Sequence, residues 1–480
     1  MNLLESYKNR LAISESVHQK SHNGARMSAG KKLMIAAVLN NTSKFLNEAF
    51  ESSAATQRSA LGDYKRFCLN ISTVALPNLI LPDLMITQPM SSITGYVTYL
   101  RYTAGINKGG VNAGDTFNGV YRMGVMTEDR ERYTSDVINE AHTATAEEVS
   151  AHAFKLNWAP IGAIKQLKIG DTTYAVVAAG SEVADTSVSV NTADGTVTFA
   201  SGDTNFVAEA SVKVLYTYDN VIIPQEKLPT LTANMDVVEL YAHARRIAVY
   251  YSQIAAFQSK TDYGTDIGEQ LAAQAQGELT YEIDTEGVFM LTNGAEEEDV
   301  LTFESYEVNA ASSTTYISRS QYYEGFSEVL NRAKKVIYTR TQKFAPNYMI
   351  VGANILTILP FLKGWTAAPA GVINGPYYAG AVDGLKVFVS PAIDENEFVF
   401  GVNGSDLKTS AGVYAPYMAI VPTQLLGFAD GTMSQGFSTM YDMKLLSTYN
   451  IVDGNRVDAK DGQYSWLLCK GKLVTAKASV

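Results

Sequence analysis

The sequence predicts an α+β protein in which helices and strands are grouped in separate parts of the chain. Three stretches support this prediction. Apolar residues have helical spacing through most of residues 1–75, short alternating runs fill residues 161–222, and a strand pattern is followed by a long helical pattern between residues 237 and 294. The other segments of the predicted fold are arranged around the third stretch.

This third stretch begins with residues 237–252, which alternate as a strand and end in a run rich in Val and Tyr. A short Thr-Asp-Tyr-Gly turn follows. Apolar residues then recur every four positions, at Ile267, Leu271, Ala275, Leu279 and Ile283. A capping box at Asp266 and Glu269 and a stop at Asn293-Gly294 delimit a helix of about 26 residues, which would be about 39 Å long.

A strand, a turn and a long helix that closes on Asn-Gly resemble the spine of the major capsid proteins of tailed bacteriophages, which have the Hong-Kong-97-type fold. The matching residues are Ala244–Val249, Leu279, Tyr281, Glu286-Gly287 and Asn293-Gly294. Two further stretches, Ala75–Tyr102 and Ala411–Pro422, are similar to segments of the T-even-like myovirus branch. The resemblance covers residues 75–155 and 223–450, and the order of its motifs makes it more specific than any single motif.

The resemblance implies a division of the chain into named segments. They are a helical N-terminal arm (1–75), the start of the P-domain with the E-loop (76–160), a β-rich insertion (161–222), the P-domain with the spine helix (223–300), an A-domain (301–445) and C-terminal strands (446–480). It also implies a structural protein that self-assembles into the hexamers and pentamers of an icosahedral phage head around the DNA genome. A minor head or vertex protein of the same fold and an encapsulin-like nanocompartment shell are the alternatives. The Pro-rich opening and the insertion favour the phage capsid.

The composition indicates a large globular protein. Its 480 residues, 46% hydrophobic and 18% charged, can bury several cores. A net charge of −11 argues against a protein that coats nucleic acid, so double-stranded DNA would be enclosed without sequence-specific binding. Cys68 and Cys469 are too few for a disulfide framework, which favours a reducing compartment. No apolar run is long enough to span a membrane, and residues 1–10 do not have the pattern of a signal peptide.

The N-terminal 75 residues predict helices on either side of the polar residues 21–30. Such a segment cannot bury its apolar face on itself, so we expect it to lie along a neighbouring subunit. Prohead proteases of T-even-like phages cut after a Leu/Ile-x-Glu pattern. Leu46-Asn47-Glu48 and Ile13-Ser14-Glu15 both match that pattern, which makes maturation cleavage after Glu48 a hypothesis, although three-residue patterns often occur by chance.

Residues 76–118 predict the E-loop of the resemblance. Pro77, Pro82 and Pro89 exclude a helix and indicate an extended segment. Residues 95–104 then alternate as a strand that enters a Gly- and Asn-rich tip. Basic residues of this hairpin either pair with acidic patches on a neighbour or form a solvated face. With two arginines of the strand before the spine helix, the assembly candidates are Arg101, Lys108, Arg122, Arg130, Arg132, Arg245 and Arg246.

Residues 161–222 predict a separate module of five short strands, with a hairpin signal at Asp194-Gly195. Strands of this length and spacing indicate a small β-sandwich or barrel. A structural brace or decoration is favoured over carbohydrate binding, because Trp158 is the only Trp nearby. By resemblance, T-even-like capsid proteins carry an insertion at the same place.

Residues 322–340 predict an amphipathic helix that opens the A-domain. The segments Gly384–Val387 and Phe398–Gly401 resemble strands of that domain, and we expect Ala415-Pro416-Tyr417 in the same domain. The acidic run Glu296–Asp299 lacks the spacing of a calcium loop, so a solvated turn is favoured over a cation site.

No catalytic, cofactor or metal site is predicted. His18 and His22 are spaced by four residues, but the Glu of an H-E-x-x-H motif is missing, so a solvated helix face is favoured. No phosphate-binding Gly motif or nucleophile motif is present. We therefore expect no enzymatic activity and no cofactor. The expected partners are further copies of the chain together with portal, scaffold or decoration proteins, and the expected location is the virion after assembly in the host cytoplasm.

Overall fold

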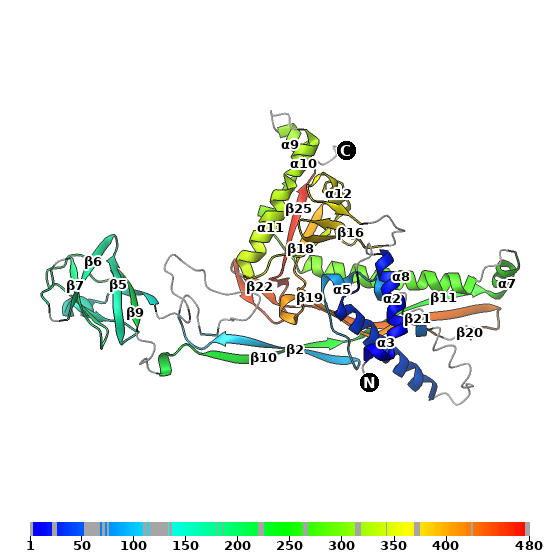
Figure 1. The fold of residues 1–480 in the computed structure, drawn as a ribbon, viewed down its shortest axis with the longest axis horizontal. Helices are drawn as coiled ribbons and strands as arrows, with labels where there is room; N and C mark the ends of the chain where they lie inside the picture. Colours follow the sequence, from blue (N-terminus) through cyan, green and yellow to red (C-terminus); the bar gives the residue numbers. More distant parts are fainter. Residues whose placement is uncertain are drawn as a thin grey trace. The chain divides into compact units, whose positions relative to one another are not determined.

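The computed structural model describes residues 3–21, 26–51, 68–69, 73, 76–108, 113–114, 133, 137–179, 181–184, 186–218, 225–262, 267–312, 318–341, 343–368, 375–423 and 426–475. The chain forms two compact units, Met1–Tyr99 with Val237–Val480, and Leu100–Asp236 (Figure 1). Strands β2 (Thr94–Ala104) and β10 (Leu231–Tyr241) pair with each other, and each continues from one unit into the other.

The first unit contains a five-stranded sheet in the order β1, β19, β21, β11, with β20 beside β21. These strands are β1 (Ile86–Thr87), β11 (His243–Ser252), β19 (Gly412–Pro422), β20 (Leu426–Gly427) and β21 (Thr432–Leu445). The 27-residue spine helix α8 (Ile267–Asn293) packs on this sheet, with Ala275 and Leu279 against Ile420 and Phe437. The long helix expected from the four-residue spacing is therefore present at the expected place.

Two details before the spine helix differ from the expectation. The single strand expected over residues 237–252 is divided at Ala242, whose N–H donates to the carbonyl of Ile93 at 2.8 Å. A helix, α7 (Gln253–Asp262), occupies residues where only a turn was expected. Its apolar side chains Ile254 and Phe257 are 71% and 73% exposed, so they are not buried by this chain.

A second sheet has eight strands in the order β12, β25, β18, β14, β17, β16, β15, with β13 beside β25. They are β12 (Glu296–Glu297), β13 (Phe303–Glu304), β14 (Tyr348–Val351), β15 (Thr366–Ala367), β16 (Tyr377–Val382), β17 (Leu385–Val389), β18 (Glu397–Gly401) and β25 (Leu468–Val474). Every residue of β14 is buried, as expected for a strand covered on both faces.

Helices accompany this second sheet. They are α9 (Tyr306–Ser312), α10 (Arg319–Glu324), α11 (Phe326–Thr341) and α12 (Ala353–Leu356), with single 3₁₀ turns at Asp299–Leu301, Leu359–Phe361 and Leu407–Thr409. Gly325 divides the one amphipathic helix expected over residues 322–340 into α10 and α11. Phe326 of α11 packs edge-on against Phe398 of β18, at 5.5 Å between ring centroids.

Two strands, β19 and β25, belong to a different sheet from the one expected for them. Strand β19, which contains Ala415-Pro416-Tyr417, pairs with β1 and β21 in the sheet under the spine helix. Strand β25, expected among separate C-terminal strands, pairs with β18 and β12 inside the second sheet. The remaining strands of that segment, β22 (Thr448–Val452), β23 (Asn455–Asp458) and β24 (Tyr464–Ser465), form a small sheet of their own. Alternation in the sequence marks a strand but does not show its partner.

The N-terminal helices are α1 (Leu3–Ser6), α2 (Lys8–Ser21) and α3 (Ala29–Glu51). Helix α3 packs on β19 of its own chain, where the hydroxyl of Thr42 accepts the N–H of Ala419 at 3.2 Å. Its apolar face is buried at Met34, Ile35, Val38, Leu39 and Leu46. The sheet of the same chain therefore covers the apolar face that was expected to need a neighbouring subunit, and a contact of this helix with a neighbour stays a prediction.

The Pro-rich segment contains two short helices, although prolines were expected to exclude them. A 3₁₀ turn spans Leu76–Asn78, and α5 spans Leu81–Leu84. Pro82 lies in the first turn of α5, where a missing N–H costs no hydrogen bond. Proline therefore limited the length of the helix without preventing it.

The second unit has a seven-stranded sheet in the order β3, β9, β5, β6, β7, β8, β4. The strands are β3 (Val137–Thr143), β4 (Ala153–Lys155), β5 (Ile161–Ile169), β6 (Thr172–Ala178), β7 (Ser187–Asn191), β8 (Thr196–Phe199) and β9 (Ser211–Tyr218), and α6 (Ala146–Ala151) and a 3₁₀ turn (Gln225–Lys227) accompany them. Strands β5 to β9 are the five expected ones. Strands β3 and β4 complete the sheet. Together with helix α6, they precede residue 161, where the β-rich module was expected to begin.

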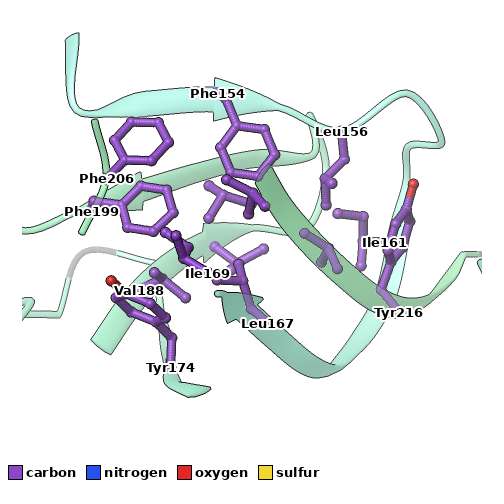
Figure 2. Close-up of a cluster of buried hydrophobic side chains, with 14 of the residues drawn as sticks. Phe154, Leu156, Ile161, Leu167, Ile169, Tyr174, Val188, Phe199, Phe206 and Tyr216 are labelled. Atoms are coloured by element: carbon purple, nitrogen blue, oxygen red, sulfur yellow. The ribbon is translucent and has the colours of Figure 1, made fainter. Parts of the chain in front are cut away.

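The core of this unit is aromatic (Figure 2). The rings of Phe199 and Phe206 stack at 4.1 Å between centroids, and Phe154 packs on both. Gly195, at the hairpin between β7 and β8, has a φ of 72°, a conformation that Gly adopts without strain. The Asp194-Gly195 signal therefore located a hairpin correctly.

Candidate assembly surfaces

The two arginines of β11 point to opposite faces of their sheet, because successive side chains of a strand alternate. Arg245 faces the spine helix, where its guanidinium lies 2.6 Å from Glu286 Oε1 and over the ring of Tyr441 at 5.4 Å. The hydroxyl of Tyr441 donates to Glu286 Oε2 at 2.5 Å. The bond to Glu286 raises the pKa of Arg245, and burial together with Glu286 raises the pKa of Tyr441. Arg246 is exposed on the other face.

A groove of about 810 Å³ opens beside the Arg245–Glu286 pair. Its lining comes from the end of the spine helix, from β11 and β21, and from β24 and β25. Phe289 contributes a side chain that is 58% exposed, and His243, Asp442 and Lys470 contribute polar groups. This mixture of an aromatic ring with polar and charged groups is typical of a protein–protein contact.

Lys108, one of the E-loop candidates, is not available on the surface. Only 4% of it is exposed. Its ammonium donates to the hydroxyl of Tyr218 at 2.6 Å and lies 4.6 Å from the centre of that ring and 5.4 Å from the Trp158 ring. Lys108 therefore holds the residues that follow β2 against Trp158 and β9, which is a structural role rather than a binding one.

The structure describes only one of the other basic E-loop candidates, and only its backbone. Arg101 lies in β2, and its side chain is outside the described part of the chain. Arg122, Arg130 and Arg132 lie outside the described residues altogether.

The acidic run Glu296–Asp299 is not a solvated turn, contrary to the expectation. Arg340 of α11, with 5% of its side chain exposed, pairs with Glu296 at 2.7 Å and also with Glu298. Arg456 of β23 pairs with both carboxylates at 2.8 Å. Charges taken out of water need such partners. The run therefore joins α11, β12 and β23, and local charge patterning could not show the distant arginines.

His18 is also buried rather than solvated, with 5% exposed, while His22 lies outside the described residues. A ring nitrogen of His18 lies 3.4 Å from the carbonyl oxygen of Pro77. Burial, with the positive charge of Lys31, lowers the pKa of His18. Lys31, on α3, is 3% exposed, lies 3.6 Å from Asp83 Oδ2, and donates to the carbonyl of Leu79 at 3.1 Å.

Asp284 of the spine helix completes this group, although it was not among the predicted site residues. Its carboxylate is 3% exposed and accepts the backbone N–H groups of Ile80 at 3.2 Å and Leu81 at 3.4 Å. The ammonium of Lys386 in β17 lies 3.3 Å from Asp83 Oδ1, whereas Lys31 pairs with Oδ2. We call His18, Lys31, Asp83 and Asp284, together with the exposed Lys386 at their edge, the buried charge cluster. The available signal was that Asp284 shares a helical face with Val288 and Leu291, both fully buried.

Both candidate cleavage patterns lie in helices. Glu15 is in α2, where it pairs with Lys32 at 2.9 Å. Glu48 is exposed near the end of α3, and Leu46 of the same pattern is 2% exposed.

Among the residues that the structure describes, no group of three or more His, Cys, Asp or Glu side chains is arranged to hold a metal ion. Within the same residues, no helix is both long enough and apolar enough to cross a membrane.

A long spine helix on one sheet, a second sheet with its own helices, and a β-ribbon leading to a separate β-module define a shell-forming capsid protein. The chain belongs to the family described as Major capsid protein Gp23, whose model matches residues 62–468. It is a major capsid protein with the Hong-Kong-97-type fold, a structural protein of the phage head and thus of the virion. This match favours the phage capsid over the vertex-protein and encapsulin alternatives.

The solved structures to which this chain is similar share little amino-acid sequence with it. One is from Mycobacterium phage Che8, at 13% identity and TM-score 0.32, covering 51% of this chain and 76% of that chain. The mature capsid of bacteriophage PhiM1 has 10% identity and TM-score 0.33, with coverage of 52% and 77%. The capsid of Myoviridae phage XM1 has 7% identity and TM-score 0.33, with coverage of 51% and 78%. No curated protein matches the chain. The assignment therefore depends on the family match and the order of the elements.

Proposed function

We propose that the chain forms the hexamers and pentamers of an icosahedral head, and that the ribbon of β2 and β10 holds neighbouring subunits together. The supporting observation is the exposure of large apolar side chains on both strands. Tyr96 is 63% exposed, Leu231 58% and Met235 67%. A two-stranded ribbon is marginally stable alone in water, and exposed large apolar side chains along it favour a contact with a partner.

Five basic residues stay in the proposal as assembly residues: Arg101, Arg122, Arg130, Arg132 and Arg246. They would pair with acidic side chains of a neighbouring copy, whose surface is acidic because the net charge is −11. Lys108 and Arg245 leave this set, since their charged groups are bound within the chain. Charge pairs at such an interface would select the correct register more than they add affinity.

We further infer that the shell encloses double-stranded DNA without sequence-specific contacts, that portal, scaffold or decoration proteins join it, and that it assembles in the host cytoplasm. The net charge of −11 supports weak, nonspecific contact with DNA. In this proposal the chain performs no catalytic step and needs no cofactor.

Maturation cleavage after Glu48 is a separate proposal. It is supported only by the Leu46-Asn47-Glu48 pattern, and the burial of Leu46 means that α3 would have to unfold locally before a protease could bind. The intact mass of virion-derived protein tests it. A mass of 52.1 kDa for the whole chain would remove the proposal, and a mass matching a chain that begins at Ala49 would support it.

Electron microscopy of the chain co-expressed with its neighbouring head genes tests the ribbon contact. The variant is Leu231→Ser with Met235→Ser, and the control is Val176→Ser, which changes a side chain 41% exposed on β6. We expect closed shells from the parent and the control. The double variant should remain folded by circular dichroism but form no shells. Normal shells from the double variant would contradict the role of the ribbon.

A further inference from the structure

The buried charge cluster connects the N-terminal helices to the spine helix through residues 76–85. Lys31 holds this segment from α3, and Asp284 holds it from α8. In Figure 1 the labels of α2, α3, α5 and α8 lie together in the first unit, and the contacts of α5 with α8 and of both N-terminal helices with Leu76–Asn78 agree with this view. Local unfolding of the N-terminal helices and of this segment, which takes both away from the spine helix, would expose Lys31 and Asp284 to water.

Asp284 is the carboxyl group of the cluster whose ionised form is disfavoured by its surroundings. A carboxylate that loses its water is unfavourable unless hydrogen bonds or cations replace that water. Asp284 has backbone N–H donors at 3.2 to 3.4 Å, long for bonds to a charged acceptor. Burial raises its pKa from 3.8 to about 7, and the backbone bonds and Lys31 oppose this rise only in part.

We propose that the buried charge cluster is a proton-linked latch, which holds α2, α3 and residues 76–85 on the spine helix more tightly when Asp284 is protonated than when it is ionised. The direction follows from linkage. The closed latch binds a proton that the open latch, with its exposed carboxyl group, releases. Between pH 3.8 and 7, each unit of rising pH therefore favours opening by up to about tenfold.

Two other members of the cluster act in the opposite direction. Burial lowers the pKa of His18 and of Lys31, so the closed latch releases protons that the open latch would bind on these groups. His18 opposes Asp284 below pH 6.5 and makes the net slope smaller there. The remaining groups that face the cluster are Asp83 of α5, Lys386 of β17, and the tyrosines Tyr378 and Tyr414, whose pKa values are raised above 10.

Hydrogen exchange of the chain of residues 1–480 before shell assembly, between pH 5.5 and 8, measures the latch directly. Exchange in peptides from α2 and α3, corrected for the intrinsic rate, is compared with peptides from β14 to β18 in the same sample. The His18→Gln background removes the opposing histidine. In that background we expect opening of α2 and α3 to rise by up to about tenfold per pH unit to pH 7 and then to level off. Adding Asp284→Asn, which has the same size but does not ionise, should remove this rise.

A second variant keeps the proposal testable if Asp284→Asn does not fold. The negative charge of Asp83 contributes to the raised pKa of Asp284. Asp83→Asn should therefore move the midpoint of the opening curve to lower pH. Three results would overturn the latch: no rise in opening between pH 5.5 and 7, the same rise in protein carrying Asp284→Asn, or an unmoved midpoint with Asp83→Asn.

Discussion

Gly287 of the spine helix lies directly against the side chain of Leu81 in α5. A Cβ atom at position 287 would be 3.1 Å from Leu81 Cγ and closer still to both methyl carbons. Leu81 is fully buried, so it cannot move aside without disturbing its neighbours. The Glu286-Gly287 pair of the capsid resemblance is thus explained by two contacts, because Glu286 pairs with Arg245 and Gly287 leaves room for Leu81.

Gly287→Ala should lower the free energy of unfolding by about 1–2 kcal/mol, because overpacking against Leu81 exceeds the gain in helix propensity. Gly277 in the same helix is the matched control, since nothing lies within 4 Å of a Cβ placed there. Gly277→Ala should raise stability by up to about 1 kcal/mol. Urea unfolding followed by circular dichroism measures both. Equal effects of the two substitutions would contradict the packing argument.

Arg340→Ala should lower the free energy of unfolding by about 2–3 kcal/mol, because it leaves the half-buried Glu296 and Glu298 with Arg456 as their one remaining cation among the described residues. The control is Arg332→Ala, which breaks a pair with Glu328 on the exposed side of the same helix and should cost about 0.5 kcal/mol. Thermal unfolding of both variants checks the difference. Loss of less than about 1 kcal/mol from Arg340→Ala would show that the acidic run does not need this arginine.

Acid should destabilise the protein through Glu296. Burial alone would raise the pKa of this carboxyl group, but bonds from Arg456 and Tyr449 and the charge of Arg340 lower it below 4.5. Because the folded state prefers the ionised form, this stabilisation is present above pH 4.5 and is lost as the pH falls through the lower, folded value. The Glu296→Gln protein should therefore be less stable than the parent at pH 6. Between pH 5 and 3 it should lose less stability than the parent loses. Urea unfolding across this pH range measures the difference. If the free energy of unfolding changed equally with pH in both proteins, the role of Glu296 would be refuted.

Arg245→Ala and Arg246→Ala should have different consequences, although the two residues are adjacent. Arg245→Ala should cost about 1 kcal/mol, a value kept small because 38% of the side chain is exposed. Arg246→Ala should change stability by less than about 0.5 kcal/mol and instead reduce the yield of shells. Unfolding curves and electron microscopy of both variants test this. Defective assembly with Arg245→Ala alone would reverse the assignment.

Much of the fold could be predicted because its signals are local. The four-residue spacing located the spine helix, and the Asp-Gly turn located the hairpin between β7 and β8. Helix α7 was not predicted because its ten residues contain only two large apolar residues, Ile254 and Phe257, too few to establish a helical period.

The pairing of distant segments could not be predicted. Nothing within Leu468–Val474 shows that this strand pairs with β12 and β18, and nothing within Glu296–Asp299 points to Arg340 or Arg456. The burial of Asp284 was accessible from its position beside Val288 and Leu291, but its backbone partners were not.

The position of β25 constrains the order in which the chain can fold during synthesis. This strand lies between β12 and β18 in the second sheet and also pairs with β13, yet it is synthesised after every other strand of that sheet. Until then, β18 lacks its neighbour on that side and β12 and β13 lack their pairing partner. Nascent chains crowded on one messenger therefore cannot complete this sheet early, which delays formation of an assembly-competent surface until β25 has left the ribosome.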